Sequence, residues 1–442
     1  MSDINYPVHW NSSRVEEITQ FLGRGIGPSY SEFESSTVAI NQKCVRNGSV
    51  NPELGRYHVD QNSVRASSVL KDGDVCINST GDGTIGRVGL WESPDDKRKF
   101  FVDSHVTIAR PIGGVIDSKY LNELLSSDWV QAELERFCFT GSTNQVELSR
   151  SALLLLNLRY PEIDKQQKIA KILRTVDNLI EKTQTLIDKY TAIKQGMMAD
   201  LFTRGIDMTT GDTSSEKGGK LRPSVEDAPE LYKQTELGWV PKEWEVRLLG
   251  DISTISSGIT LGNEYSGSDA VKVPYLRVAN VQDGYLDLEE TKVVKIPPSH
   301  VAKYLLEVGD VLMNEGGDFD KLGRGTIWGG EVEGCCHQNH VFKVRAQRSQ
   351  LLPEYLAYWS ASSFGKSYFI MNSKQSTNLA SINSSQLKRF PVLVSSIDEQ
   401  QIILERLKTV DGNISKLELD IDKNKRVKKG LMKDLLTGTV KV

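Results

Sequence analysis

The chain of 442 residues is long enough for two to four domains of ordinary size, each with its own apolar core. Its net charge is −4, so any contact with nucleic acid must come from local patches or be completed by a partner. No run approaches the ~18 apolar residues of a membrane span, nothing at the N-terminus resembles a signal peptide, and the five cysteines lack framework spacing. These features predict a cytoplasmic protein without membrane contact.

Residues 1–160 predict a globular domain that mixes strands with helices. Apolar and β-branched runs alternate with Gly, Asn, Ser and Asp clusters, as in DVCINSTGDGTIGRVGLW over residues 74–91. Such alternation is typical of short strands joined by glycine-rich turns. Residues 120–137 have helical spacing. We therefore expect an α+β domain.

A long amphipathic helix is predicted over residues 161–206. Its apolar residues recur at steps of three and four over about five heptads, which is typical of a coiled-coil seam. Asp164 is expected to cap its start, and Gly205 is expected to follow its end. About 40 residues at ~1.5 Å each give a length of roughly 60 Å. The polar, Gly- and Ser-rich residues 207–240 then predict an exposed linker.

The second half of the chain repeats this order. Residues 241–394 predict another α+β domain, and residues 395–442 another helix, with Asp398 as its expected cap. A shift of 234 residues aligns residues 163–206 with residues 397–440 without a gap, and 20 of the 44 positions are identical. The chain is therefore a tandem duplication.

Both predicted helices have a heptad seam, which is typical of helices that pack against one another. Each helix would then bury its heptad seam against the other. The residues predicted to form this seam are Ile169, Leu173, Val176, Ile180, Ile187, Ile403, Leu407, Val410, Ile414 and Ile421.

This layout resembles the specificity (HsdS) subunits of type I restriction-modification systems over essentially the whole chain. The most specific pieces are ELGWVPKEWEVRLLGDI (236–252) and the two helix endings, KQGMMADLFTRGI and KKGLMKDLLTGTV. The resemblance implies two target-recognition domains, at 1–160 and 241–394, that each read one half of an interrupted double-stranded DNA site. It also implies that the conserved helices pack antiparallel and separate these domains.

The resemblance further implies how chemistry is divided within the assembly. Two modification subunits would dock on the helices and carry S-adenosylmethionine and adenine methylation. Restriction subunits would add translocation and cleavage that depend on ATP and Mg. The chain itself would hold no cofactor and catalyse nothing.

The sequence offers two weak signals for other chemistry. Phe21-x-Gly23-x-Gly25 matches the loose pattern of an adenine methyltransferase cofactor loop, but no strand clearly precedes it and no Asp/Asn-Pro-Pro-aromatic motif occurs. Gly25 has a repeat echo at Gly258, so we attribute it to turn geometry. Cys335, Cys336, His337 and His340 fit no trusted zinc spacing, so buried thiols and a packed histidine are the preferred interpretation.

The residues expected to contact DNA lie in polar loops of both domains. Arg and Lys suit guanine edges, Asn and Gln suit adenine, and carboxylates accept from cytosine. Such loops are also often plain turns, which remains the competing interpretation. The candidates are Ser79, Thr80, Asp82, Thr84, Arg87, Ser142, Thr143, Asn144 and Gln145 in the first domain, and Glu315, Asp318, Lys321, Arg324, Lys374, Gln375, Ser376, Thr377 and Asn378 in the second.

Two alternatives stay open at this point. The same fold could serve a methylation or phage-defence assembly that has no nuclease. The chain could instead be a coiled-coil scaffold with two protein-binding domains, in which case binding to DNA with the steep salt dependence of phosphate contacts would be absent.

Overall fold

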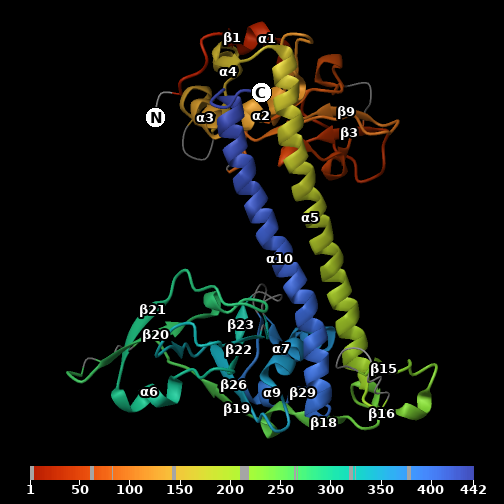
Figure 1. Cartoon of the computed structure of the whole chain (residues 1–442), viewed down its shortest axis with the longest axis vertical. Helices are drawn as coiled ribbons and strands as arrows, with labels where there is room; N and C mark the ends of the chain where they lie inside the picture. Colours follow the sequence, from red (N-terminus) through yellow and green to blue (C-terminus); the bar gives the residue numbers. More distant parts are fainter. Residues whose placement is uncertain are drawn as a thin grey trace. The chain divides into compact units, whose positions relative to one another are not determined.

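The computed structural model describes residues 4–59, 64–81, 83–141, 146–209, 219–262, 265, 267–317, 322–323, 325–375 and 380–442, with the backbone only of Gln375. The chain forms two compact units (Figure 1). Unit 1 is Met1–Thr185 with Glu418–Val442, and unit 2 is Leu186–Leu417. The long helices α5 (Ile163–Thr203) and α10 (Ile397–Leu436) contribute a part to each unit.

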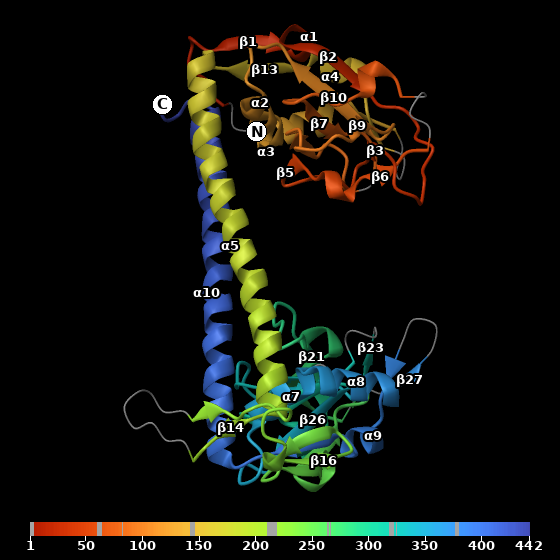
Figure 2. The same cartoon turned by 90° about the vertical axis from the view of Figure 1, so that its right-hand side faces the viewer.

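Unit 1 is built on a six-stranded sheet in the order β2-β10-β7-β8-β5-β4. Its apolar core lies between this sheet, the helices and the end of α10 (Figure 2). A smaller sheet, β6-β3-β9, lies beside it. The sheet elements are β2 (Thr19–Arg24), β3 (Thr37–Ile40), β4 (Val45–Arg46), β5 (Gly48–Val50), β6 (Arg56–Tyr57), β7 (Val75–Asn78), β8 (Val88–Leu90), β9 (Lys99–Val102) and β10 (Val106–Pro111).

The remaining elements of unit 1 close the domain. β1 (Asn11–Arg14) pairs with β13 (Asn157–Tyr160), which brings the two ends of the domain together directly before α5. β11 (Phe139–Thr140) pairs with β12 (Glu147–Leu148). The helices are α1 (Val15–Ile18), α2 (Ser118–Ser126), α3 (Asp128–Glu133) and α4 (Arg150–Leu155).

Unit 2 repeats this plan. Its four-stranded sheet β19-β26-β22-β24 corresponds to β2-β10-β7-β8 of unit 1, and its β18-β29 pair corresponds to β1-β13. The elements are β18 (Glu245–Leu248), β19 (Ser253–Ser257), β20 (Val271–Leu276), β21 (Lys292–Ile296), β22 (Val311–Asn314), β23 (Gly316–Gly317), β24 (Gly325–Ile327), β25 (Cys336–His337), β26 (Val341–Ala346), β27 (Lys374–Gln375), β28 (Ala380–Ser381), β29 (Pro391–Val394), α6 (Pro298–Tyr304), α7 (Pro353–Ala361), α8 (Ser363–Asn372) and α9 (Ser384–Lys388).

An ion pair made by a buried aspartate supports the central strands in both units. Asp74, 1% exposed at its side chain, accepts two hydrogen bonds from the Arg110 guanidinium, at 2.7 and 2.8 Å. Asp310 and Arg345 repeat this pair with the same two distances in unit 2. Both aspartates lie in a Gly-Asp-Val sequence, at residues 73–75 and 309–311, so this match between the two halves reflects a shared structural support.

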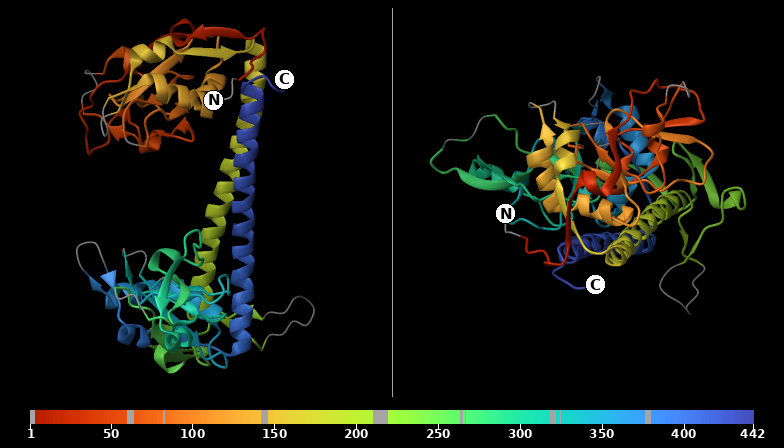
Figure 3. Two further views of the ribbon diagram at one scale, coloured as in Figure 1. Left: turned by 90° about the vertical axis from the view of Figure 1, so that its left-hand side faces the viewer. Right: turned by 90° about the horizontal axis from the view of Figure 1, so that it is seen from above.

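The two long helices run antiparallel in each unit, as their contacts and Figure 3 show. In unit 1 the Lys428 ammonium lies 2.7 Å from Asp177, and in unit 2 the Lys194 ammonium lies 2.6 Å from Asp411. Lys194 corresponds to Lys428 and Asp411 to Asp177, and each correspondence spans 234 positions, the offset of the sequence repeat. Lys428 also pairs with Glu123 of α2, where burial raises the pKa of the Glu123 carboxyl above its usual value.

The fold class predicted from the sequence, a tandem repeat of two α+β domains with two long antiparallel helices, is therefore confirmed. The predicted seam residues lie along the facing sides of the helices. Buried are Ile169, Leu173, Ile187, Ile403, Leu407, Val410 and Ile421, and half-buried are Val176, Ile180 and Ile414.

The predicted helix caps are wrong, because α5 and α10 each begin one residue before Asp164 and Asp398. Ser396 precedes α10, and its hydroxyl accepts a hydrogen bond from the Glu399 amide at 3.2 Å. The predicted stop at Gly205 is correct, and Gly438 follows α10 in the same way. The φ angles of Gly205 and Gly438 are +63° and +74°, which glycine adopts without strain.

The prediction of an exposed linker is wrong for the described residues 219–240. This segment forms β15 (Lys220–Leu221), which pairs with β14 (Ile206–Asp207), and a hairpin of β16 (Tyr232–Thr235) and β17 (Gly238–Pro241). Arg222, Tyr232 and Val240 are buried in unit 2. The polar composition predicted exposure, but Arg222 in this segment pairs with a buried carboxylate.

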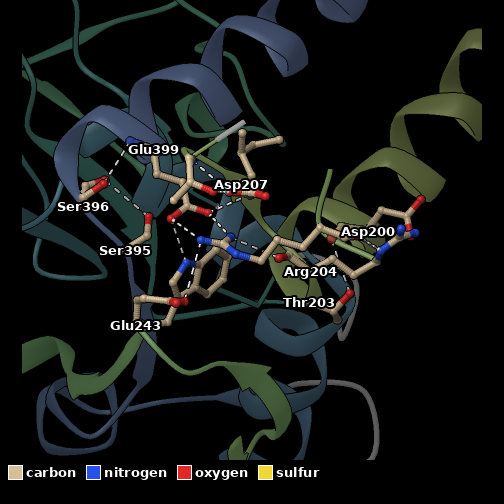
Figure 4. Close-up of polar contacts among 12 residues, drawn as sticks. Asp200, Thr203, Arg204, Asp207, Glu243, Ser395, Ser396 and Glu399 are labelled. Carbon is tan, nitrogen blue, oxygen red and sulfur yellow. Dashed lines mark hydrogen bonds and ion pairs between the residues drawn. The ribbon is translucent and has the colours of Figure 1, made fainter. Parts of the chain in front are cut away.

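That carboxylate is Glu399, 3% exposed, in the first turn of α10 (Figure 4). One oxygen accepts hydrogen bonds from the Ile206 amide and the Arg222 guanidinium, at 2.7 and 2.5 Å. The other accepts from the Trp244 indole at 3.0 Å. Glu399 therefore ties the segment after α5 to the start of α10 and to the entry of the second domain.

Within the residues that the structure describes, no helix combines the length and apolar composition needed to span a bilayer.

Candidate nucleic-acid interface

In unit 1, two polar loops that are distant in the sequence meet at the end of β7. The Ser79 amide donates to the His105 carbonyl at 2.8 Å, and the Ser79 carbonyl accepts from the Leu148 amide at 2.8 Å. Thr80 forms a bridge with Glu147, the first residue of β12. The turn that begins at Ser79 is thus fixed against the hairpin β11-β12.

Unit 2 brings its corresponding loops together in the same way. The Glu315 amide donates to the His340 carbonyl at 2.9 Å, and the Glu315 carbonyl accepts from the Ile382 amide at 2.8 Å. The next residues, β23, pair with β28, which pairs with β27. We call the two loops and the histidine beside them the paired-loop site of each unit.

A histidine lies at the same place in both paired-loop sites, but its side-chain partner differs. In unit 1, His105 Nδ1 lies 2.7 Å from the Thr80 hydroxyl. In unit 2, His340 Nδ1 lies 2.5 Å from a Glu315 carboxylate oxygen. The His340 and Glu315 side chains are 56% and 29% exposed, so a ligand can reach both.

The structure gives the predicted residues of the first loop different roles. Thr84 donates to the Thr80 carbonyl at 3.2 Å, so it stabilises the turn. Arg87 is exposed, and one guanidinium nitrogen donates to the Gly83 carbonyl at 2.8 Å. Ser79 does not fit the role predicted for it, because it is fully buried and its hydroxyl lies 2.5 Å from that of Thr107.

In unit 2, Lys374 is exposed at the start of β27, where its ammonium is available to a ligand. The other predicted contact residues lie outside the described part of the chain, or are described by backbone alone. Outside the described part are Asp82, Ser142, Thr143, Asn144, Gln145, Asp318, Lys321, Arg324, Ser376, Thr377 and Asn378. Only the backbone is described for Gln375.

Two kinds of supporting residue were missed by sequence reasoning. Asn78 and Asn314, buried at the ends of β7 and β22, donate through Nδ2 to the carbonyls of Gln42 and Val281 at 3.0 Å. Both asparagines follow Gly-Asp-Val at the same distance, which is a signal that the repeat comparison could have found. Arg24, which pairs with Glu147 at 3.1 Å, has no equivalent in the other half because Ser257 replaces it.

The glycine pattern around Gly25 belongs to a strand. Phe21 and Gly23 lie in β2, which pairs with β10, so they form no cofactor loop. The expected turn geometry at Gly25 and Gly258 is wrong. A Cβ at these positions would lie 1.8 Å from the Val102 carbonyl oxygen and 1.9 Å from the His337 carbonyl oxygen, so close backbone approach requires glycine there.

The Cys/His cluster is held by internal hydrogen bonds. Burial lowers the pKa of His337 to about 4, and its Nδ1 lies 2.6 Å from the Val341 carbonyl oxygen. Burial raises the pKa of the Cys336 thiol to about 11, so it is not a reactive thiolate at neutral pH. No group of three or more His, Cys, Asp or Glu in the described ranges is arranged to hold a metal ion.

Two similar α+β units, each with an exposed paired-loop site on the same strand framework, define a duplicated recognition protein built on an antiparallel helix pair. Residues 7–190 and 241–425 match the family model of the type I restriction modification DNA specificity domain. The matches cover more than half of the chain, which therefore belongs to this family.

Named relatives agree with this membership. The protein assigned as the type I restriction enzyme MjaX specificity subunit of Methanocaldococcus jannaschii is 30% identical over 213 residues, 48% of this chain and 49% of the relative. The MjaVIII specificity subunit of the same organism is 26% identical over 305 residues, 65% of this chain and 63% of the relative. The chain thus aligns with about half to just under two thirds of the length of these relatives.

Solved structures share the fold at low identity. The S subunit of a type I restriction-modification system from M. genitalium has a TM-score of 0.52 at 14% identity, covering 98% of this chain and 97% of that one. A chain from a study of complex assembly and conformational transition of the type I R-M system has a TM-score of 0.56 at 14% identity, covering 99% and 100%.

Proposed function

We propose that this chain is the DNA-reading subunit of a type I restriction-modification assembly, in which each unit recognises one half of a bipartite double-stranded site. The observation that carries this proposal is the paired-loop site, which occurs once in each unit on one shared framework. Exposed hydroxyl, carboxylate, guanidinium and ammonium groups at such a site are the groups that read base edges and hold phosphates.

The chemistry of the assembly is then assigned to other subunits. Two modification subunits bind S-adenosylmethionine and methylate adenine, and restriction subunits use ATP and Mg. This chain supplies recognition and a docking surface, and it binds no cofactor itself.

We expect the purified chain to transfer no methyl group to DNA, because the sequence contains no Asp/Asn-Pro-Pro-aromatic motif. Mixed with its modification subunit, the same preparation should methylate one bipartite motif. The measurement is incorporation of labelled methyl groups from S-adenosylmethionine, followed by mapping of the modified adenines. Methyl transfer by the chain alone, in a preparation free of partner, would contradict the assignment.

The surface of α5 supports docking of a partner through apolar contact. Four of its apolar side chains recur at intervals of seven residues and are 37–50% exposed: Ile172, Leu179, Leu186 and Ile193. This spacing is that of a coiled-coil stripe, and an exposed stripe of this kind marks an interaction surface. The corresponding positions of α10 are mostly polar: Arg406, Asn413, Asp420 and Val427.

Replacement of Leu179 by Glu should weaken binding of a modification subunit at least tenfold, about 1.4 kcal/mol, because a charge would replace an apolar contact. The matched control is Asn413→Glu, which places the same charge at the corresponding exposed position of α10. Mass photometry of the assembly at falling concentration measures the loss. Equal behaviour of the two variants would argue against docking on the α5 stripe.

A further inference from the structure

The two paired-loop sites share a backbone framework but differ in the side chain that follows the buried asparagine. Ser79 and Glu315 each come directly after that asparagine, and each makes the same two backbone hydrogen bonds, one to a histidine carbonyl and one from the second loop. The repeat therefore works as an internal comparison. The backbone framework therefore forms with either serine or glutamate at this position.

The two side chains have different surroundings. The Ser79 hydroxyl is enclosed and bonded to Thr107 of β10. The residue at the place of Thr107 in β26 is Phe342, which offers no polar partner, and the Glu315 carboxylate extends to His340 instead. Because unit 1 forms the same framework without an acid, folding of the site does not explain the carboxylate of Glu315.

The hydrogen bonds around Glu315 fix which atoms are available to a ligand. An ionised carboxylate only accepts, so His340 Nδ1 carries a hydrogen and donates to Glu315 Oε2 at 2.5 Å. The Asn339 side-chain amide lies 3.4 Å from the other ring nitrogen, His340 Nε2. Among the described residues Oε1 of Glu315 has no hydrogen-bond partner, so it is left as an oriented acceptor.

An oriented carboxylate on a DNA-facing loop is unfavourable next to phosphates, which carry the same charge. It is favourable where it meets a donor, and the major-groove donors of DNA are the exocyclic amino groups of cytosine and adenine. We propose that Glu315, positioned by His340, selects a base with such an amino group in the half-site read by unit 2. This inference rests on the proposed function and adds the chemical group that one residue recognises.

The test is the base preference of the assembly with its modification subunits, measured by methylation of oligonucleotides that vary one base pair at a time. In Glu315→Gln, His340 Nδ1–H still attracts an oxygen, so the amide nitrogen turns toward the base as a donor. We expect preference at one position of one half-site to fall roughly 5- to 150-fold and to shift toward bases whose exocyclic major-groove group is an acceptor, guanine O6 or thymine O4, because the amide oxygen is held by His340 and only the amide nitrogen faces the base. All other positions should keep their preference.

Two further variants make the outcome decisive. Glu315→Ser installs the side chain that the same framework accepts in unit 1, so it should fold, and it should lose the preference at that position without the shift. Glu307→Gln removes another carboxylate of unit 2, 62% exposed and paired with Arg345, and should leave all preferences unchanged.

Unchanged preferences in both Glu315 variants, with methylation intact, would overturn the inference and leave the proposed function standing. A wild-type assembly without any sequence preference would instead refute the proposed function. A preference lost in the other half-site would contradict the inference as well, because Glu315 belongs to unit 2.

Discussion

Exchange of residues 241–394 for the corresponding domain of another family member should replace one half of the recognised DNA motif and leave the other half unchanged. The reason is structural independence. The paired-loop site of unit 2 is built from β22, β23, β26, β27 and β28, all of which lie inside this range. No residue of unit 1 takes part in its described hydrogen bonds.

The structure indicates how such an exchange should be cut. β18 pairs with β29, so the two ends of the exchanged segment lie side by side next to the helices. The incoming domain must keep the aromatic contacts of Phe202 in α5, whose ring lies 5.3 Å from that of Tyr355 and 5.4 Å from that of Trp359. It must also keep Trp244, because this indole donates to Glu399.

The measurement is mapping of methylated adenines in cells that carry the hybrid chain and its modification subunit. The reciprocal exchange of residues 1–160 serves as the control and should alter the other half of the motif. Simultaneous change of both halves by a single exchange would refute two independent recognition modules. If the hybrid methylates no motif, its thermal unfolding shows whether the chain has folded. A hybrid that fails to fold is then not mistaken for one that has changed both halves of the motif.

Much of the fold could be predicted because the chain is a tandem duplication and both copies have the same pattern. The heptads of residues 163–206 and 397–440 are periodic over many turns, and their mutual match indicates a duplication without reference to any long-range contact. Local periodicity and repetition are signals that a single sequence contains.

The roles of single loop residues could not be predicted in this way. Ser79 and Thr80 are adjacent polar residues of one turn, yet one is enclosed against Thr107 and the other reaches His105. The difference depends on which side chains the neighbouring strand β10 presents, and that pairing is not encoded in the spacing of the loop itself. The loop pattern therefore predicts a polar site without identifying its exposed groups.

The structure of the segment after α5 could be predicted even less well from the sequence. Its polar composition is typical of a linker, but Arg222 meets Glu399 across 177 residues of sequence. The corresponding residue in the first helix is Lys165, so the repeat comparison gives no hint of a buried acid either. Only the tertiary structure brings Arg222, Ile206 and Trp244 to one carboxylate.

Glu399→Ala should destabilise unit 2 by about 3–5 kcal/mol, because it removes one partner of a buried ion pair and leaves the other uncompensated. The Arg222 side chain is only 9% exposed and would keep its charge away from water. The Trp244 and Ile206 N–H groups would also lose their acceptor. The matched control is Glu243→Ala, since Glu243 lies 3.8 Å from the same guanidinium but is 66% exposed. This control should change stability by no more than about 0.5 kcal/mol.

Urea titration followed by tryptophan fluorescence can measure this effect, since Trp244, Trp328 and Trp359 are buried in unit 2. The double variant Glu399→Leu with Arg222→Met tests whether the uncompensated charge causes the loss of stability. Removing both charges and filling their space should recover part of the loss, because the uncompensated cation is then gone. If the double variant were less stable than Glu399→Ala, the cost would come from lost packing at the start of α10. The ion pair would then not be what fastens residues 219–222 to that helix.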